Sequence, residues 1–103
     1  MTPEGRVKAK LKEWLRARHA YFFMPVQTGY GAATLDFLIC LNGRFIAYET
    51  KRPGGHLTPR QKLVAAQISA ARGMVFRVTL DKKDELVFEE LTYDVVAPRP
   101  NSL

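Results

Sequence analysis

Three residues whose side chains suit phosphate chemistry lie close together in the middle of the chain: Asp36, Glu49 and Lys51. Between them is Asn42-Gly43, a pair typical of the two-residue type I′ turn, and strand-like segments flank it on both sides. Such a turn fixes the register of a β-hairpin, and counting outward from it places Asp36 opposite Glu49. Two carboxylates are therefore expected on one face, with their β-carbons about 5 Å apart.

This pair of carboxylates predicts a site for a hard divalent cation. Like charges directly opposite each other destabilise a hairpin, so something cationic should compensate them. Side chains alternate along a strand, which places Lys51 on the same face as Glu49. Mg²⁺ or Mn²⁺ would take Asp36 and Glu49 as oxygen ligands. The hypothetical reaction is attack of a water near Lys51 on a phosphodiester, with loss of the 3′-oxygen. The alternative is an exposed Glu–Lys ion pair, which contributes at most about 1 kcal/mol.

Two helices would position these residues, because the chain contains two helix-start signals. Thr2-Pro3-Glu4 and Thr58-Pro59 each combine a capping threonine with proline at the first helical position. The first helix is predicted to run from about residue 3 to 18. The second is predicted to continue to about Arg72 and to end at Gly73.

The remaining segments predict a small sheet. Strands are expected at residues 21–24, 35–41, 44–51 and 74–79. Residues 81–96 fit either a third helix or a hairpin partner for the strand before them. The fold class is therefore α/β, a small mixed β-sheet of about four strands with flanking helices. At 103 residues the chain is expected to be one domain over residues 1–96, followed by a loose tail at 97–103.

Two residues at the starts of the helices share a face with apolar neighbours. Glu4 lies three and seven positions before apolar residues of its helix, and Gln61 has the same relation to the apolar face of the second helix. Either Glu4 is a solvated carboxylate favoured by the helix N-terminus, or it belongs to the metal site. Either Gln61 makes only local hydrogen bonds in the first turn, or it also belongs to the site.

The charge of the chain indicates a polyanionic partner. The formal net charge is +6, and basic surfaces attract phosphates through counterion release. Arg52, Arg60 and Lys62 flank the proposed centre and would contact DNA phosphates, which positions a duplex without reading its sequence. His56 either contacts phosphate or is an ordinary loop residue. Tyr30 either contacts DNA from its glycine-flanked loop or is simply a solvent-exposed aromatic.

The single cysteine and the apolar runs exclude several other classes of protein. One cysteine permits neither an internal disulfide framework nor a Cys-rich zinc site, and Cys40 is expected to be buried because it lies within the apolar run 37–41. The longest apolar run is about five residues, whereas a membrane span needs about 20. The sequence also begins without the apolar stretch of a signal peptide. A cytoplasmic location is therefore expected.

The order of these features resembles a known nuclease family. Asp36 followed by Glu49-Thr50-Lys51 on the next strand is similar to the Asp…Glu-x-Lys signature of the PD-(D/E)xK nuclease superfamily, whose core is restriction-endonuclease-like. A glutamate early in the first helix, a Gly-containing loop before Asp36 and the segment Leu57–Gln61 resemble the virus-type replication-repair nuclease (VRR-NUC) domain. The resemblance covers about residues 4–79. It departs from the family at Leu35, where the pattern has proline.

The resemblance implies a role for each matching residue. It implies that Asp36, Glu49 and the Thr50 main-chain carbonyl are metal ligands, with Glu4 as an outer carboxylate. It implies that Lys51 is the catalytic lysine and that Gln61 assists in the active site. The implied protein is a Mg²⁺- or Mn²⁺-dependent endonuclease that acts as a homodimer on branched DNA, such as a Holliday junction or a flap. The single small domain and its thin core also favour a homodimer.

Two alternatives to a nuclease remain open at the level of sequence. One is a non-catalytic basic module that binds nucleic acid without cutting it. The other is a structural subunit of a phage or mobile-element replication complex, in which the acidic residues only order a loop. Metal-dependent cleavage distinguishes both alternatives from a nuclease.

Overall fold

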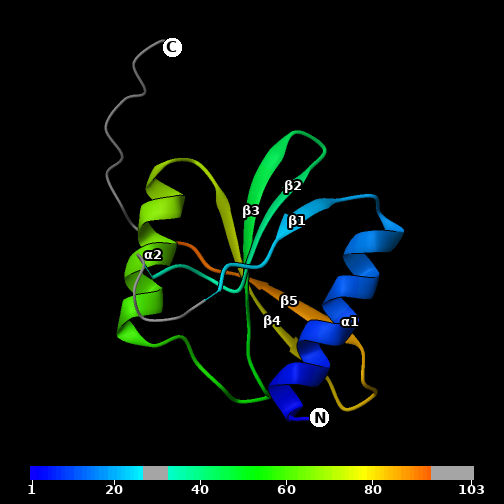
Figure 1. The fold of residues 1–103 in the computed structure, drawn as a ribbon. Coiled ribbons are helices and arrows are strands. Elements are labelled where there is room, and N and C mark those ends of the chain that lie inside the picture. Colours follow the sequence, from blue (N-terminus) through cyan, green and yellow to red (C-terminus); the bar gives the residue numbers. More distant parts are fainter. Residues whose placement is uncertain (27–32, 94–103) are drawn as a thin grey trace.

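Two helices flank a five-stranded sheet in the computed structural model, which describes residues 1–26 and 33–93 (Figure 1). Both helices begin at the predicted threonine–proline pairs. In each helix, the threonine hydroxyl accepts a hydrogen bond from a first-turn amide. The C-terminal end of each helix lies one or two residues before the predicted end. The elements are α1 (Pro3–Ala17), β1 (Tyr21–Phe23), β2 (Phe37–Leu41), β3 (Arg44–Thr50), α2 (Pro59–Ala70), β4 (Met74–Leu80) and β5 (Leu86–Glu90).

The strands lie in the order of the sequence, and the sheet is mixed as predicted. β1, β2 and β3 are antiparallel neighbours, α2 connects β3 to its parallel neighbour β4, and β5 returns antiparallel to β4. The number of strands is five rather than about four, because residues 86–90 form the hairpin partner and not a helix. The turn before β5 is closed by the Asp81 amide, which donates to the Glu85 carbonyl at 2.9 Å.

The β2–β3 hairpin has the predicted turn and register. Asn42 and Gly43 both have positive φ, 53° and 75°, as a type I′ turn requires. Leu41 pairs with Arg44, and the ladder continues until Phe37 faces Tyr48. Asp36 is the next residue outward from this last pair on one chain segment, and Glu49 is the next on the other. The turn therefore sets the position of both carboxylates.

The two helices bury different faces of the sheet. On one face, Val7, Leu11 and Leu15 of α1 are fully buried against a core that includes Phe37 and Tyr48. On the other face the buried cluster is smaller and lies between α2 and the middle of the sheet. It consists of Leu35, Ala47, Leu57, Ala65 and Val75. The residues of this second cluster come from the segments that border the predicted site.

An acidic residue in the β4–β5 turn anchors α1. Asp84 forms an ion pair with Arg6 and another with Lys10, whose Nζ also donates to the Asp84 carbonyl at 2.6 Å. The carboxylate of Asp84 has a pKa of about 2, below its usual value, chiefly because Arg6 donates hydrogen bonds to it. These contacts fix the rotation of α1, and Glu4 and Lys8 extend from the same two turns toward the end of β3.

Cys40 is exposed, so the prediction that it is buried is wrong. Its strand neighbours Ile39 and Phe37 face the α1 core, whereas Cys40 points to the opposite side of the sheet. On that side the α2 cluster reaches β3 and β4 and includes Leu38 at its border, but it does not extend over Cys40. An apolar run indicates a strand buried on both faces only when helices cover both faces.

Within residues 1–26 and 33–93, no helix is long and apolar enough to cross a membrane. The predicted boundary between the domain and the tail 97–103 lies outside the described residues.

Candidate metal centre

Three carboxylates meet at the end of β3, and each comes from a different segment. Glu4 extends from the first turn of α1, Asp36 directly precedes β2, and Glu49 is the penultimate residue of β3. One oxygen from each lies within 4.8 Å of the others. Glu4 and Asp36 are partly exposed, while Glu49 is only 1% exposed. The three predicted acidic residues are therefore brought together at the border between the core and the surface.

Hydrogen bonds across the hairpin end hold Asp36 in place. Thr50 donates to Asp36 Oδ2 twice, from its hydroxyl at 2.7 Å and from its amide at 3.2 Å. In return, the Asp36 amide donates to Glu49 Oε1 at 3.1 Å. Thr50 is fully buried, so its side chain serves as an internal support for the carboxylate. This supporting hydroxyl was missed by sequence reasoning, whose prediction that the Thr50 carbonyl is a ligand stays a prediction.

Gln61 reaches Glu49 from the start of α2, and its amide orientation is fixed by the helix cap. The side-chain Oε1 of Gln61 accepts a hydrogen bond from the Thr58 main-chain amide at 2.9 Å. In return, the main-chain amide of Gln61 donates to Thr58 Oγ1 at 3.2 Å. This reciprocal capping box directs the Gln61 Nε2 group to Glu49 Oε2, 3.1 Å away. The hydrogen bonds of Gln61 are therefore not only local, because its first-turn bonds orient the side-chain amide that donates to Glu49; its membership of a metal site stays a prediction.

The environment of Glu49 favours its protonated form. Burial first, and the neighbouring Asp36 second, raise the pKa of Glu49 to about 8, although Lys51 and the Asp36 amide act in the opposite direction. Two hydrogen-bond donors to a carboxylate usually favour ionisation. Here desolvation and like charge outweigh them.

Two lysines lie beside the carboxylates, one at Glu49 and one at Asp36. Lys51 Nζ lies 3.6 Å from Glu49 Oε2, and its side chain is only 13% exposed. Lys8 Nζ lies 3.8 Å from Asp36 Oδ1, with a side chain that is 36% exposed. Lys51 was predicted at this position and Lys8 was not. The missed signal is helical spacing, since Lys8 lies four residues after Glu4 and therefore on the same side of α1.

The predicted DNA contacts from α2 and the loop before it are exposed. Arg52 follows Lys51 directly, His56 lies further along the same loop, and Arg60 and Lys62 flank Gln61 in α2; all four are exposed. From β4, Arg77 steadies this loop by donating to the Gly55 carbonyl at 2.5 Å. Tyr30 lies outside the described residues.

The donor set fits a hard divalent cation. Three carboxylates face two ammonium groups, so full ionisation leaves a surplus of one negative charge. A cation among the three oxygens would offset the repulsion from Asp36 that, after burial, raises the pKa of Glu49. Oxygen-only ligands are those that Mg²⁺ and Mn²⁺ prefer.

No protein-family model matches the chain, and no curated protein is significantly similar to it in sequence.

Proposed function

We propose that the protein is a metal-dependent nuclease that hydrolyses phosphodiester bonds in DNA. The observation that carries the proposal is the meeting of the Glu4, Asp36 and Glu49 oxygens within 4.8 Å, with Lys51 Nζ 3.6 Å from Glu49. Carboxylates and a lysine in such proximity suit the activation of water beside a phosphate. The net charge of +6 supports a polyanionic substrate.

Each side chain has a distinct part in this proposal. Asp36 and Glu49 would hold Mg²⁺ or Mn²⁺, with Glu4 as the outer carboxylate. The bound ion would supply Lewis-acid stabilisation of charge on the phosphate and a lower pKa for a water. Lys51 would orient the attacking water, and Gln61 and Thr50 are positioning residues that act through Glu49 and Asp36. Lys8, which lies beside Asp36, would contact a phosphate oxygen.

A narrower proposal rests on the resemblance of Asp36…Glu49-Thr50-Lys51 to the VRR-NUC pattern. It makes the substrate branched DNA, a Holliday junction or a flap, and it places the protein in the cytoplasm as a homodimer. The residues Arg52, Arg60 and Lys62 support contact with a DNA backbone, because they are exposed cations next to Lys51 and Gln61 in the sequence.

The decisive experiment is a cleavage assay with labelled Holliday-junction, flap and linear DNA in Mg²⁺, Mn²⁺ or EDTA. We expect cutting that requires the metal and falls by about 10²–10⁴-fold in Glu49→Gln and Lys51→Ala, because each removes a group that acts on the reacting atoms. Glu90→Gln is the matched control, since Glu90 is an exposed acid on β5. It should retain full activity.

Two outcomes would contradict the proposal in different ways. Metal-dependent cutting that survives both substitutions would remove these residues from the active site. Tight DNA binding without any cutting would favour the non-catalytic binding module instead.

A further inference from the structure

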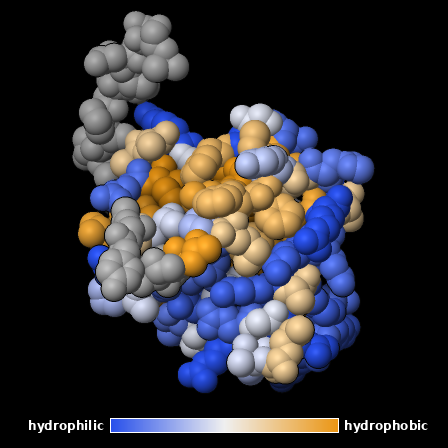
Figure 2. Space-filling model, in the orientation of Figure 1, coloured by the Kyte–Doolittle hydropathy of each residue, from blue (hydrophilic) through white to orange (hydrophobic). Residues whose placement is uncertain are grey.

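One face of the sheet carries exposed aromatic side chains beside α2. Side chains alternate along the strands, so two cross-strand rows point to this side, Tyr21–Cys40–Phe45 and Phe23–Leu38–Ala47. Ala47 is buried in the α2 cluster, but Tyr21, Phe23 and Phe45 are 72%, 56% and 49% exposed. We call these three residues the aromatic face. In the space-filling view, hydrophobic residues gather between the two helices, where Figure 1 draws β1 to β3 (Figure 2).

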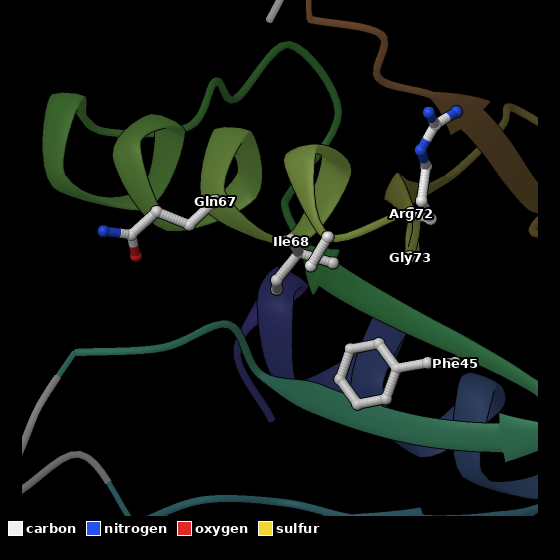
Figure 3. A pocket seen from close by; sticks show the side chains of 6 residues that line it. Phe45, Gln67, Ile68, Arg72 and Gly73 are labelled. Atoms are coloured by element: carbon white, nitrogen blue, oxygen red, sulfur yellow. The ribbon is translucent and has the colours of Figure 1, made fainter. Parts of the chain in front are cut away.

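At its α2 end the aromatic face borders a hollow of about 330 Å³. Phe45 and Ile68 form two of its walls, and the remaining lining residues are Gln67, Ala71, Arg72 and Gly73. Figure 3 shows Ile68 of α2 above the ring of Phe45, with Gly73 beside them. A β-carbon on Gly73 would lie only 2.7 Å from Ile68 Cγ2 and 3.0 Å from Phe45 Cδ1, so the absence of a side chain keeps this space open. An aromatic ring, an amide and a guanidinium are the groups that hold an unstacked nucleobase, by stacking and by hydrogen bonds to its edge.

The charges of the surrounding segments favour an anionic occupant. Residues 14–80 contain β1 to β4 and all of α2, and their only acids are Asp36 and Glu49 of the candidate metal centre. Every other acid of the chain lies before residue 14 or after residue 80. The same stretch is rich in cations, namely Arg16, Arg18, Arg44, Lys51, Arg52, Arg60, Lys62, Arg72 and Arg77. A partner that combines flat apolar groups with regular negative charge matches both properties of this surface.

The exposed area is too small for a stable protein partner. Aromatic side chains bury about 150–250 Å² each, so the exposed parts of these three supply roughly 350 Å², whereas a stable interface needs about 800 Å² per partner. Bases that stack on single rings need no such continuous area, because each stack contributes affinity by itself. The area therefore favours a nucleic acid over a protein.

The spacing of the rings on β1 favours a single strand over a duplex. Tyr21 and Phe23 lie two residues apart, which is about 6.6 Å along the strand. This distance is roughly twice the 3.4 Å rise per nucleotide within one strand of a duplex. Neighbouring rings can therefore take neighbouring bases only from a strand that is unstacked and extended.

We propose that the aromatic face binds single-stranded DNA, with bases stacked on Tyr21, Phe23 and Phe45 and a phosphate at Arg72. The inference rests on the proposed function in taking DNA as the partner. Phe45 and Glu49 lie on the same side of β3, four residues and therefore about 13 Å apart along the strand. This is the length of about two to four nucleotides. A single-stranded arm held on the aromatic face can thus reach the carboxylates.

The test is fluorescence anisotropy of the full chain with a labelled thymidylate strand of about 12 nucleotides, in EDTA so that no metal-dependent cleavage occurs. The wild type is expected to bind this strand more tightly than a hairpin duplex of the same length. Phe23→Leu keeps an apolar side chain but loses the ring, so it should weaken binding by about fivefold or more. Phe23→Tyr keeps the ring and should retain the affinity.

Two further variants serve as matched controls. Val87→Ala removes apolar surface from the opposite edge strand β5, where Val87 is 41% exposed, and should leave the affinity unchanged. Arg72→Gln should reduce the slope of log K against log salt concentration by about 0.7, the value for one phosphate contact of a single strand. Lys82→Gln changes the net charge equally and should not reduce it. Circular dichroism verifies folding, and Tyr21→Leu replaces Phe23→Leu should the latter be unfolded.

Several outcomes would overturn the inference. They are the absence of binding, unchanged affinity in Phe23→Leu and Tyr21→Leu, an equal loss in Val87→Ala, and tighter binding of the duplex. A polyglutamate peptide of the same charge that competes as well as the thymidylate strand would also overturn it, because charge alone would then account for binding. An equal loss of slope in Arg72→Gln and Lys82→Gln would overturn the placement of the phosphate.

The binding assay needs no metal, so its result is separate from that of the cleavage assay. A chain that cuts DNA but fails the binding assay keeps the proposed function and loses the aromatic face as a binding surface. A chain that binds the single strand through these rings without cutting DNA keeps the aromatic face and loses the nuclease activity.

Discussion

Glu49 holds its proton at neutral pH in the absence of a cation, because burial and the neighbouring Asp36 raise its pKa to about 8. A metal ion needs the ionised carboxylate, so binding must release that proton below pH 8. The same side chain thus links three properties of the molecule: its stability, its affinity for metal and the pH at which the centre assembles.

The stability of the metal-free protein is expected to fall as the pH rises from about 4.5 to 8. In this window the folded chain keeps a proton on Glu49 that the unfolded chain has lost, and the state that binds more protons loses stability with rising pH. Glu49→Gln cannot ionise, so it should remove this fall and raise the free energy of unfolding at pH 8 by on the order of a few kcal/mol. Urea unfolding in EDTA, followed by Trp14 fluorescence, measures both profiles. Parallel profiles would contradict the assignment.

At the scale of elements, the first turn of α2 combines two tasks. The capping box between Thr58 and Gln61 satisfies the free amides at the helix start, and it also aims the Gln61 amide at Glu49. The corresponding cap of α1, where Thr2 accepts from the Gly5 amide, involves no residue that contacts the carboxylates through its side chain. Substitutions in the two caps can therefore be compared to separate an effect on helix stability from an effect on the alignment of the carboxylates.

Thr58→Ala and Thr2→Ala are each expected to cost about 1 kcal/mol in the free energy of unfolding, the usual cost of losing a capping hydroxyl. Only Thr58→Ala should also lower cleavage, because losing the hydroxyl that accepts from the Gln61 main-chain amide loosens the turn that carries Gln61, although the Thr58 main-chain amide can still donate to Gln61 Oε1. Unfolding in urea and single-turnover cleavage by both variants provide the comparison. Equal cleavage activity in the two variants would show that the α2 cap does not align Gln61 with Glu49.

Local signals predicted the elements that local chemistry determines. The two Thr-Pro starts gave the helices, and the Asn42-Gly43 turn gave the register that brings Asp36 to Glu49. The β5 segment was ambiguous because the spacing of its apolar residues fits both a helix and a strand. Its pairing with β4 makes it a strand. Cys40 was assigned wrongly because the lateral reach of a helix over a sheet is a tertiary property. Lys8 was missed although its helical spacing from Glu4 places both residues on one side of α1, and its pairing with Asp36 depends in addition on how α1 packs beside the hairpin end.

At the scale of the whole molecule, the positive charge is expected to appear in the salt dependence of DNA binding. Each phosphate contact that is lost reduces the slope of log K against log salt concentration by about 0.9. The double substitution of Arg60 and Lys62 by glutamine should therefore reduce the slope by about 1.8 if both contact phosphates. Changing Lys82 and Lys83, exposed in the β4–β5 turn, to glutamine alters the net charge equally and should leave the slope nearly unchanged.

Fluorescence anisotropy with Ca²⁺ in place of Mg²⁺ measures binding without cleavage. An equal loss of slope in the two double variants would mean that DNA contacts the molecule without preference for the α2 side.

The placement of the two helix starts has an electrostatic consequence of its own. Glu4 and Gln61 both belong to first turns, so the first turns of α1 and α2 each lie within a side-chain length of the carboxylates. Each helix N-terminus carries the equivalent of about half a positive elementary charge, which arises from peptide dipoles and does not titrate. An anion at the centre therefore meets a fixed positive background built into the backbone, which persists when lysines are substituted and at every pH at which the chain is folded.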